Sequence, residues 1–397
     1  MARQVRIGDR WVGDGHPCLV VAEAGLNHDG QPHKAEILIE QAAKAGADAV
    51  KFQRRTIDRL LSREALDAGY SGPNAYGETY GSHRRALELP DAAWPRLKAL
   101  AESLGLLFFS SAWDGPSVDF LETLGVPCHK LPSACLTDSL LVDYAAQKGR
   151  PLILSTGMSS LEEVEAAVQI VWRHHHQLVV LQCTSAYPAV PGDLNLRVIW
   201  SYRRWLGVVL GYSGHETGLA PSLAAVALGA CLVERHFTLD RGAKGPDHRA
   251  SLEPDDFKRL VEGIREVEAA LGDGVKRCLP SEEAARRKLA KSVVLKVGVP
   301  RRHVLMPDDL ELKGPGTGVP AGQLAGVVGL VAREDLPTGT VLRLVGLKRR
   351  PLWRRLGWWP RLVRQHYRIL RRLNRRAVAF REALRLAWAA VRPARKT

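Results

Sequence analysis

Short apolar runs and longer helical patterns alternate eight times between about residue 18 and residue 270, and this alternation constrains the fold more than any other feature. The runs, in chain order, are CLVVAEAG, AVKFQ, LLFFSSAW, CHKLPS, PLILSTGM, LVVLQCTS, GVVLGYSGH and CLVERHF. Segments between them, such as 34–45, 92–104, 161–173 and 254–271, space their apolar residues three and four apart, as helices do. Runs that are apolar on both faces indicate parallel strands covered by helices. The sequence therefore predicts an α/β protein built on a closed (β/α)8 barrel.

An open, doubly wound α/β sheet is the alternative for the same alternation of strands and helices. Such sheets usually carry a glycine-rich phosphate loop directly after the first strand, and none follows CLVVAEAG here. The closed barrel is therefore favoured.

Three segments of different composition follow the predicted barrel domain. We expect the barrel domain to span residues 1–278 and a charged helical linker to span 279–291. Residues 292–347 are rich in Gly, Pro and Val, which predicts a small β-rich second domain with turns at the glycines and prolines. Residues 348–397 place apolar residues three or four apart with arginines between them, the pattern of a basic amphipathic helix or helix pair.

Net charge separates this C-terminal segment from the rest of the chain. The whole chain carries +15, but residues 348–397 hold 17 Lys or Arg against one acid, so the remainder carries 40 minus 41, or −1. With Trp353, Trp358, Trp359 and Trp388, the segment from 352 to 397 is predicted to dock on an anionic membrane surface or on a protein partner. Nucleic-acid binding fits the charge, but it fits the apolar stripe less well.

The six cysteines are widely spaced and form no CxxC pair, which is typical of the reduced cytosol. The N-terminus has no apolar signal region, and no stretch reaches about 18 uninterrupted apolar residues. We therefore expect a cytoplasmic protein, with attachment to the inner membrane face left open through its tail.

Polar residues follow nearly every predicted strand, at the end where the loops of a barrel build the active site. They are Glu23, Asn27 and His28; Lys51 and Gln53; Ser110 and Ser111; Lys130 and Ser133; Thr156; Thr184, Ser185 and Tyr187; Ser213 and His215; Glu234 and His236. Lys51 and Lys130 would direct two ammonium groups into one mouth, which suits a small anion carrying phosphate or carboxylate.

His215 and His236 are 21 residues apart, the length of one strand and helix, so both imidazoles should reach neighbouring strand ends. Two imidazoles with an acid such as Glu23 or Glu234, and with positions left for water or substrate, suit a catalytic divalent metal. Spacing alone leaves open the alternative of two hydrogen-bonded structural histidines.

The motifs AEAGLNHDG, DAVKFQRRT, SSAWD, KLPSA, ILSTGMSS, CTSAYP, GYSGHETG, ERHFTLD and PDHRASLEP occur in this order and closely resemble those of the sialic acid synthase family. This family comprises the N-acetylneuraminate synthases and their legionaminate and pseudaminate relatives. The resemblance covers residues 18–347, and LELKGPGTGVPAGQLAGVVGLVAREDLPTGTVL resembles the family's antifreeze-like (SAF) domain.

The resemblance implies a (β/α)8 barrel that condenses phosphoenolpyruvate with an N-acetylhexosamine-type aldehyde to give a nine-carbon 2-keto acid and phosphate for polysaccharide biosynthesis. It implies a Mn²⁺ or Mg²⁺ ion on His215 and His236, an acidic catalytic residue at Glu23, and a homodimer in which the SAF domain of one subunit caps the barrel of the other. The implied substrate-binding residues are Lys51, Gln53, Ser110, Lys130, Ser133, Ser185, Tyr187 and Ser213. Beside these, Glu234 is a further catalytic candidate from its place at a strand end, and Asp247 is a further candidate for substrate binding.

Two departures from the family pattern lie on the side of the acceptor sugar. Cys135 occupies a position where the family commonly has an acid, and Gly314 follows Lys313 where the family's SAF domain often has arginine. A thiol does not replace a carboxylate that accepts hydrogen bonds from sugar hydroxyls. We therefore expect an acceptor other than N-acetylmannosamine, unless Asp138 or Asp247 takes the place of the missing acid.

Two further interpretations remain open from the sequence. One is a phosphoenolpyruvate condensation on a sugar phosphate, with Arg54, Arg55 and Arg249 available for the acceptor phosphate. The other is a catalytically idle barrel that recruits polysaccharide enzymes through its basic tail.

Overall fold

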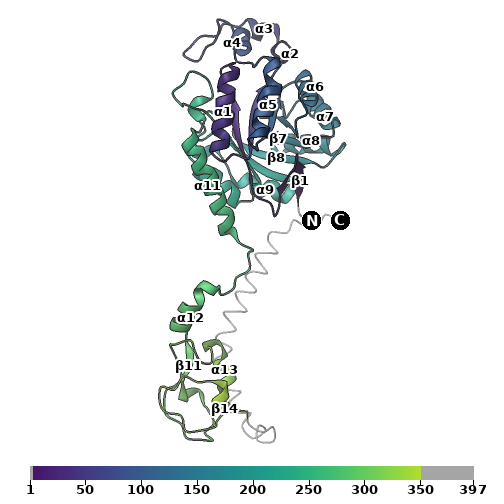
Figure 1. The fold of residues 1–397 in the computed structure, drawn as a ribbon. Helices are drawn as coiled ribbons and strands as arrows, with labels where there is room; N and C mark the ends of the chain where they lie inside the picture. Colours follow the sequence, from purple (N-terminus) through teal and green to yellow (C-terminus); the bar gives the residue numbers. More distant parts are fainter. Residues whose placement is uncertain (1–2, 350–397) are drawn as a thin grey trace, which may run out of the picture. The chain divides into compact units, whose positions relative to one another are not determined.

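The computed structural model describes residues 3–349, and its main feature is a closed barrel of eight parallel strands (Figure 1). The strands are β3 (Leu19–Gly25), β4 (Ala49–Arg54), β5 (Leu107–Ala112), β6 (His129–Leu131), β7 (Leu152–Ser155), β8 (Leu178–Cys183), β9 (Val209–Gly214) and β10 (Leu232–His236). Each pairs with the next along the chain, and β10 pairs back with β3. Each predicted run contains one strand, so the predicted barrel is confirmed and the open sheet was the wrong alternative.

Helices follow the strands and cover the outside of the barrel. The main ones are α1 (Pro32–Lys44), α5 (Trp94–Ser103), α6 (Gly115–Leu124), α7 (Ser139–Gln147), α8 (Leu161–Trp172), α9 (Arg197–Trp205), α10 (Ala220–Ala227) and α11 (Pro254–Leu271). Short 3₁₀ turns lie between them: η1 (Asp91–Ala93), η2 (Ser133–Cys135), η3 (Pro191–Asp193) and η4 (His248–Ala250). Every residue of β3, β8, β9 and β10 is buried, because side chains pack on both faces of the sheet.

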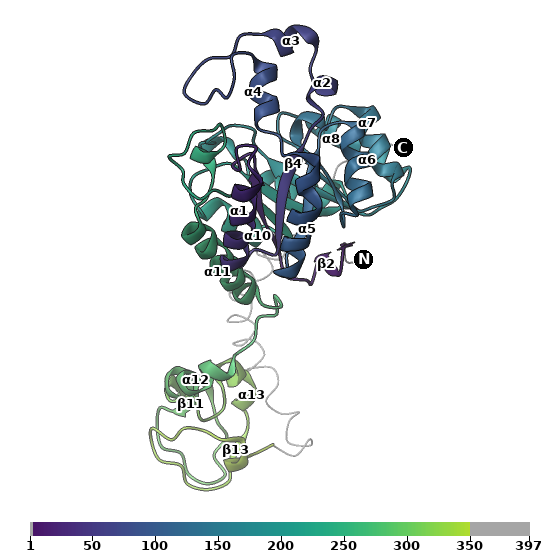
Figure 2. The same cartoon turned by 45° about the horizontal axis from the view of Figure 1, so that its top comes forward.

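The two ends of the barrel carry different additions (Figures 1 and 2). A hairpin of β1 (Gln4–Ile7) and β2 (Arg10–Gly13) adds Val5, Ile7 and Val12 to the barrel's core. Three short helices interrupt the connection from β4 to α5: α2 (Ile57–Leu60), α3 (Arg63–Asp67) and α4 (Tyr80–Ala86). Both views place these helices at the end of the barrel opposite the hairpin, above the C-terminal ends of the strands.

A second compact unit begins after Gly274. It contains η5 (Pro280–Glu282), α12 (Glu283–Leu289), β11 (Ser292–Leu295), η6 (Pro307–Asp309), β12 (Leu310–Lys313), η7 (Ala321–Gln323), α13 (Leu324–Val327), β13 (Val331–Ala332), η8 (Leu344–Gly346) and β14 (Leu347–Lys348). Its strands pair as two antiparallel ladders, β11 with β12 and β13 with β14. A small core of aliphatic side chains, including Val293, Leu295 and Leu305, holds the unit together.

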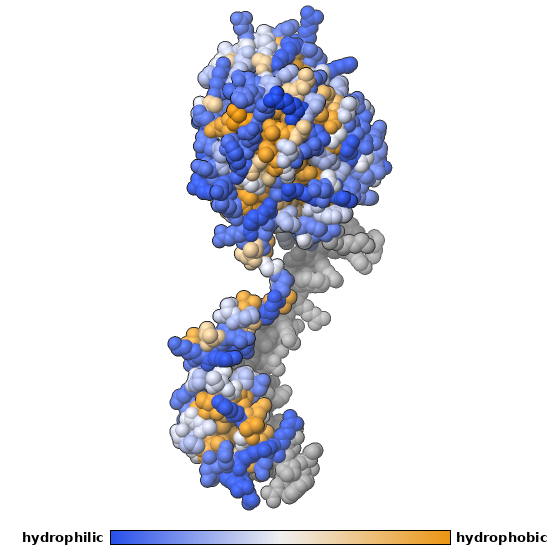
Figure 3. Space-filling view, viewed as in Figure 1, coloured by the Kyte–Doolittle hydropathy of each residue, from blue (hydrophilic) through white to orange (hydrophobic). Residues whose placement is uncertain are grey.

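Hydrophilic residues surround smaller hydrophobic patches on the face of the barrel unit seen in Figure 3. Within residues 3–349, no helix combines the length and the apolar composition that crossing a membrane requires. The segment 352–397, predicted to be a basic amphipathic helix, lies outside the described residues.

Candidate functional site

A cavity of about 250 Å³ opens at the C-terminal ends of the barrel strands. All eight strands contribute a polar side chain to it, as the convergence of strand-end residues predicted. Its lining consists of Glu23, Lys51, Gln53, Ser111, Trp113, Lys130, Pro132, Ser133, Ala134, Ser155, Met158, Cys183, Ser185, Tyr187, Ser213, His215, Glu234 and His236.

A buried cluster of opposite charges forms one part of the wall. Lys51 Nζ lies 2.7 Å from Glu23 Oε2 and 3.6 Å from Glu234 Oε1, and it donates to Ser111 Oγ at 2.8 Å. Gln53 Nε2 donates to the other oxygen of Glu23 at 2.8 Å. Burial raises the pKa of Glu23 to about 7, and the charge of Glu234 adds to this effect while Lys51 opposes it. Glu23 is therefore suited to exchanging a proton near neutral pH.

Lys130 is the second cation of the cavity, and its partners are neutral. Its ammonium donates to Ser155 Oγ at 2.7 Å and to the Leu131 carbonyl at 3.1 Å, and it is only 2% exposed. No carboxylate of residues 3–349 forms an ion pair with it within 4.0 Å. Burial lowers the pKa of Lys130 because the charged form loses hydration. Glu234 attracts this ammonium from farther away, and an anion in the cavity would supply the direct ion-pair partner that it lacks.

Two imidazoles face each other across neighbouring strand ends, with ring centroids 5.3 Å apart. His215 Nδ1 lies 2.7 Å from the Thr184 carbonyl, so Nδ1 carries the proton and Nε2 presents a lone pair. Burial lowers the pKa of His236 to about 4, which keeps this ring neutral, and its Nδ1 is buried without a hydrogen bond. Tyr187 packs against both rings, at 4.1 and 5.8 Å between centroids.

These two rings suit a divalent cation that leaves positions open for substrate and water. Within the described part of the chain, no group of three or more His, Cys, Asp or Glu side chains is arranged to hold a metal. Within residues 3–349, a cation bound here would thus have His215 and His236 as its protein ligands, with positions left for substrate and water. An open coordination shell of this kind is what catalysis requires and a structural site lacks.

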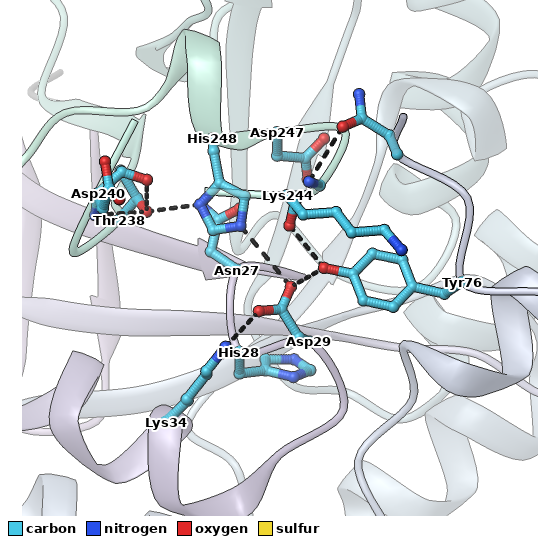
Figure 4. A network of polar contacts seen from close by, with 12 residues as sticks. Asn27, His28, Asp29, Lys34, Tyr76, Thr238, Asp240, Lys244, Asp247 and His248 are labelled. Carbon is cyan, nitrogen blue, oxygen red and sulfur yellow. Dashed lines mark hydrogen bonds and ion pairs between the residues drawn. The ribbon is translucent and has the colours of Figure 1, made fainter. Parts of the chain in front are cut away.

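Asp247 lies beside the cavity rather than in its lining. Its Oδ2 is 3.8 Å from Nδ1 of His236, the ring nitrogen that has no hydrogen bond. The next residue, His248, is held by Thr238 Oγ1 at 2.6 Å and lies 3.7 Å from Asp29 (Figure 4). The loop after β10 is thereby fixed to the loop after β3.

A third loop contacts the same residues, through hydrogen bonds to Asp29 and to the loop after β10 (Figure 4). The hydroxyl of Tyr76, from the excursion between β4 and α5, lies 2.8 Å from Asp29 Oδ1 and 2.5 Å from the Lys244 carbonyl. The Gly245 amide donates to Asn74 Oδ1 at 3.2 Å. Three loops that are distant in the sequence therefore meet at one side of the cavity mouth and set the position of Asp247.

The expectation that Ser110 lines the cavity was wrong, and Ser111 takes that place. Successive residues of a strand point to opposite faces, so Ser111 shares the inner face with Lys51, while Ser110 is fully buried and donates to the Ser111 carbonyl at 3.3 Å. The other predicted substrate residues except Asp247 line the cavity. Sequence reasoning missed Trp113, Ala134, Ser155, Met158 and Cys183.

The cavity lining beside η2 combines the hydroxyl of Ser133 with apolar side chains. Cys135 is buried, its thiol points to the Trp113 carbonyl at 3.6 Å, and it is not in the lining. Trp113, Ala134 and Met158 face the cavity there. Asp138 does not replace the missing acid, because its carboxylate caps α7 by accepting from the Leu141 amide at 3.0 Å.

The two arginines at the end of β4, Arg54 and Arg55, already form ion pairs with acids of the protein. Arg54 pairs with Asp91 at 2.8 Å, and Arg55 pairs with Glu88 at 2.7 Å in a fully buried position. The suggestion that both are free for an acceptor phosphate is therefore wrong. Arg249 is exposed and forms no ion pair within residues 3–349.

Comparison with known proteins adds independent findings. The model of the NeuB family matches residues 38–276, and that of the SAF domain matches residues 290–348. The chain is 44% identical over 322 residues to the human N-acetylneuraminate-9-phosphate synthase, covering 81% of this chain and 90% of that protein. It is 38% identical over 336 residues to the N,N'-diacetyllegionaminic acid synthase of Legionella pneumophila, covering 83% of this chain and 94% of that protein.

A solved structure agrees with these matches. The N-acetylneuraminic acid synthetase of Leptospira borgpetersenii, in complex with citrate, superposes with a TM-score of 0.64 at 31% identity. The alignment covers 72% of this chain and 95% of that one.

Proposed function

Since this chain belongs to the NeuB family, we propose that it condenses phosphoenolpyruvate with an N-acetylated amino-sugar aldehyde in a reaction that depends on Mn²⁺ or Mg²⁺. Its relatives are named as sialic, legionaminic and pseudaminic acid synthases, and the chain is a synthase of this kind: a transferase that joins phosphoenolpyruvate to a sugar by a carbon–carbon bond. The products are a nine-carbon 2-keto acid and phosphate.

One observation carries the proposal: Lys130 is a buried ammonium whose hydrogen-bond partners are a hydroxyl and a carbonyl. Glu234 attracts it only from beyond ion-pair distance, and a buried charge without a direct ion-pair partner is costly unless a ligand supplies one. Phosphoenolpyruvate carries both a carboxylate and a phosphate. Lys51 and Lys130 hold these groups in our account, and the hydroxyls of Ser133, Ser155 and Ser185 donate to the same anion.

In the reaction, C3 of phosphoenolpyruvate bonds to the aldehyde carbon of the sugar, and water adds to C2. The aldehyde oxygen gains a proton, the water loses its protons, and the C2–O bond to phosphate breaks to leave the 2-keto acid. Glu23 is placed to take or deliver these protons, because its pKa of about 7 leaves both forms populated. Glu234 stays ionised beside Lys51, because neighbouring Lys130 and Lys51 outweigh burial and lower its pKa.

His215 and His236 would hold the divalent cation in our account. A cation there polarises a carbonyl oxygen and lowers the pKa of bound water. The protein's own part is to fix the two rings, which the Thr184 carbonyl does for His215.

The acceptor is proposed to differ from N-acetylmannosamine. Among the lining residues, Trp113, Ala134 and Met158 offer no carboxylate to sugar hydroxyls and suit an acyl or deoxy substituent. The test is product formation, read by mass spectrometry, from N-acetylmannosamine, its 6-phosphate and a 6-deoxy diacetamido hexose under identical conditions. If N-acetylmannosamine reacts as fast as the best alternative, this part of the proposal fails.

A phosphorylated acceptor is the second candidate. It is favoured by the likeness to the human N-acetylneuraminate-9-phosphate synthase and by the exposed side chain of Arg249, two residues after Asp247 in the chain. In the same assay, a strong preference for the 6-phosphate that is lost in Arg249→Met supports this candidate. An unchanged preference in that variant would contradict the role of Arg249.

Two partner interactions complete the proposal. We expect a homodimer in which each SAF domain caps the partner's barrel, and light scattering at twice the monomer mass would support the dimer. Peripheral binding of the 352–397 tail to anionic lipid is tested by vesicle co-sedimentation. Equal sedimentation with and without these residues would argue against it.

A further inference from the structure

A fully buried ion pair lies on the outer side of β9 and β10, next to the two histidines of the cavity. Glu216 directly follows His215 in the chain, and Arg235 directly precedes His236. Arg235 Nη1 donates to Glu216 Oε1 at 2.9 Å, with side-chain exposures of 0% and 2%. The pair therefore joins the two segments that present the imidazoles.

The hydrogen bonds around this pair fix both partners in one arrangement. Arg235 Nη1 also donates to Ser222 Oγ at 2.9 Å and to the Gly218 carbonyl at 3.0 Å, and Nη2 donates to the backbone carbonyl of Glu216. Tyr212, on β9, donates its hydroxyl to Glu216 Oε2 at 2.8 Å. A single guanidinium thus holds the side chain and the main chain of the residue that follows His215.

Strand geometry connects this outer pair to the inner rings. Arg235 and His236 are successive residues of β10, so their side chains lie on opposite faces of the sheet. Arg235 lies opposite Gly214 of β9, the residue before His215. A Cβ on Gly214 would come within 2.6 Å of Glu216 Oε2, so this backbone leaves just enough room for the carboxylate.

Stability alone does not account for such a pair. Burying two charges costs about as much as their attraction returns, and well-packed apolar side chains often serve as well or better. What the pair supplies is geometry: a planar guanidinium that donates to both the side chain and the backbone carbonyl of Glu216 has one orientation, whereas apolar packing tolerates small shifts. A metal held by only two protein ligands depends strongly on the separation of those ligands.

We propose that Arg235 and Glu216 are positioning residues that hold His215 and His236 at the separation at which both bind one divalent cation. This inference rests on the proposed metal-dependent function. It predicts that the pair governs cation affinity while leaving the phosphoenolpyruvate side, around Lys130, unaffected.

The test compares Mn²⁺ binding, followed by the electron paramagnetic resonance signal of free Mn²⁺, in the full-length parent and in Arg235→Met/Glu216→Leu. This double variant removes both charges and leaves no unpaired one. We expect Mn²⁺ affinity to fall roughly tenfold or more, as it does when groups that orient metal ligands are lost. The KM for phosphoenolpyruvate, measured at saturating Mn²⁺, should stay within about twofold of the parent value.

A matched control is Arg55→Met/Glu88→Leu, which removes another buried ion pair that flanks neither histidine. Its Mn²⁺ affinity should equal that of the parent. Arg235→Lys, with Glu216 retained, keeps the positive charge but loses the planar guanidinium and its several donors. It provides a second, milder variant if the double variant fails to fold. We expect Arg235→Lys to weaken Mn²⁺ binding several-fold without changing the KM for phosphoenolpyruvate.

The results distinguish the positioning role of Arg235 and Glu216 from the metal-dependent function on which it rests. Parent-like Mn²⁺ affinity in both Arg235 variants, with the parent binding Mn²⁺, overturns the positioning role and leaves the proposed function intact. Failure of the parent itself to bind Mn²⁺ any better than His215→Ala/His236→Ala overturns the metal-dependent function, and the positioning role with it.

Discussion

The ammonium of Lys130 lies 2.7 Å from Ser155 Oγ at the bottom of the barrel mouth, and its other partner is a backbone carbonyl. The nearby Lys51, by contrast, is neutralised by Glu23 at 2.7 Å. The cavity therefore contains one cation in a direct ion pair and one, Lys130, for which the described residues offer no carboxylate within 4.0 Å and which Glu234 attracts from farther away. This difference identifies the side of the cavity where an anionic substrate is expected to bind.

Lys130→Met should weaken phosphoenolpyruvate binding without destabilising the fold. Losing charge-assisted hydrogen bonds worth about 1.5–3 kcal/mol should raise the KM for phosphoenolpyruvate roughly 10- to 100-fold. The free energy of unfolding should change little, because the buried ammonium forms no direct ion pair and its removal costs only a longer-range attraction to Glu234. Steady-state kinetics and urea titration measure the two effects. Lys148→Met, which removes a lysine paired with Asp119 outside the cavity, is the control and should leave KM unchanged; a parent-like KM in Lys130→Met would contradict the assignment.

Trp113→Ala tests the apolar acceptor wall. Loss of an aromatic surface that contacts a sugar should raise the KM for the acceptor about tenfold while the KM for phosphoenolpyruvate stays constant. Initial rates with each substrate varied in turn give both values. Trp11→Ala, in the hairpin at the other end of the barrel, is the matched control. Equal increases in the two KM values would show that Trp113 supports the whole cavity rather than the acceptor.

Stability should fall in mild acid because of buried neutral histidines. Burial lowers the pKa of His28 to about 4. As the pH falls below about 6.5, the unfolded chain takes up the proton first, so folding stability contributed by this ring is lost between about pH 6.5 and 4. The loss amounts to at most about 3 kcal/mol for one ring.

Urea titrations of His28→Gln between pH 4 and 7 check this expectation. The variant should lose less stability than the parent over that interval, whereas His33→Gln, on the surface, should follow the parent. The same slope in all three proteins would show that His28 is not protonated on unfolding.

Much of the site could be predicted from sequence because a parallel barrel brings all its strand ends together. Lys51, Lys130, His215 and His236 each follow or end an apolar run, so the fold alone makes them neighbours. The choice between Ser110 and Ser111 could not be made in this way. Both serines end a strand that is buried on both faces, so the hydrophobic pattern does not show which one points inward.

The prediction for the two arginines at the end of β4 was wrong for a different reason. The sequence near Arg54 and Arg55 does not show which acids pair with them. Their partners, Asp91 and Glu88, lie more than 30 residues further along the chain. The excursion that contains α2, α3 and α4 brings these acids back to the end of β4. Ion pairs closed by long loops leave no local pattern in a sequence.

Phosphate release from phosphoenolpyruvate with Mn²⁺, measured with and without a panel of amino-sugar acceptors, is the decisive test of the proposed synthase activity. We expect release that requires one acceptor, stops on removal of the cation with EDTA, returns when Mn²⁺ is restored, and is absent in His215→Ala/His236→Ala. Phosphate release that does not depend on any sugar, or that persists in the double variant, would contradict the proposed activity. Silence across the whole panel, with phosphoenolpyruvate and Mn²⁺ still bound, would contradict it as well and favour a catalytically idle scaffold.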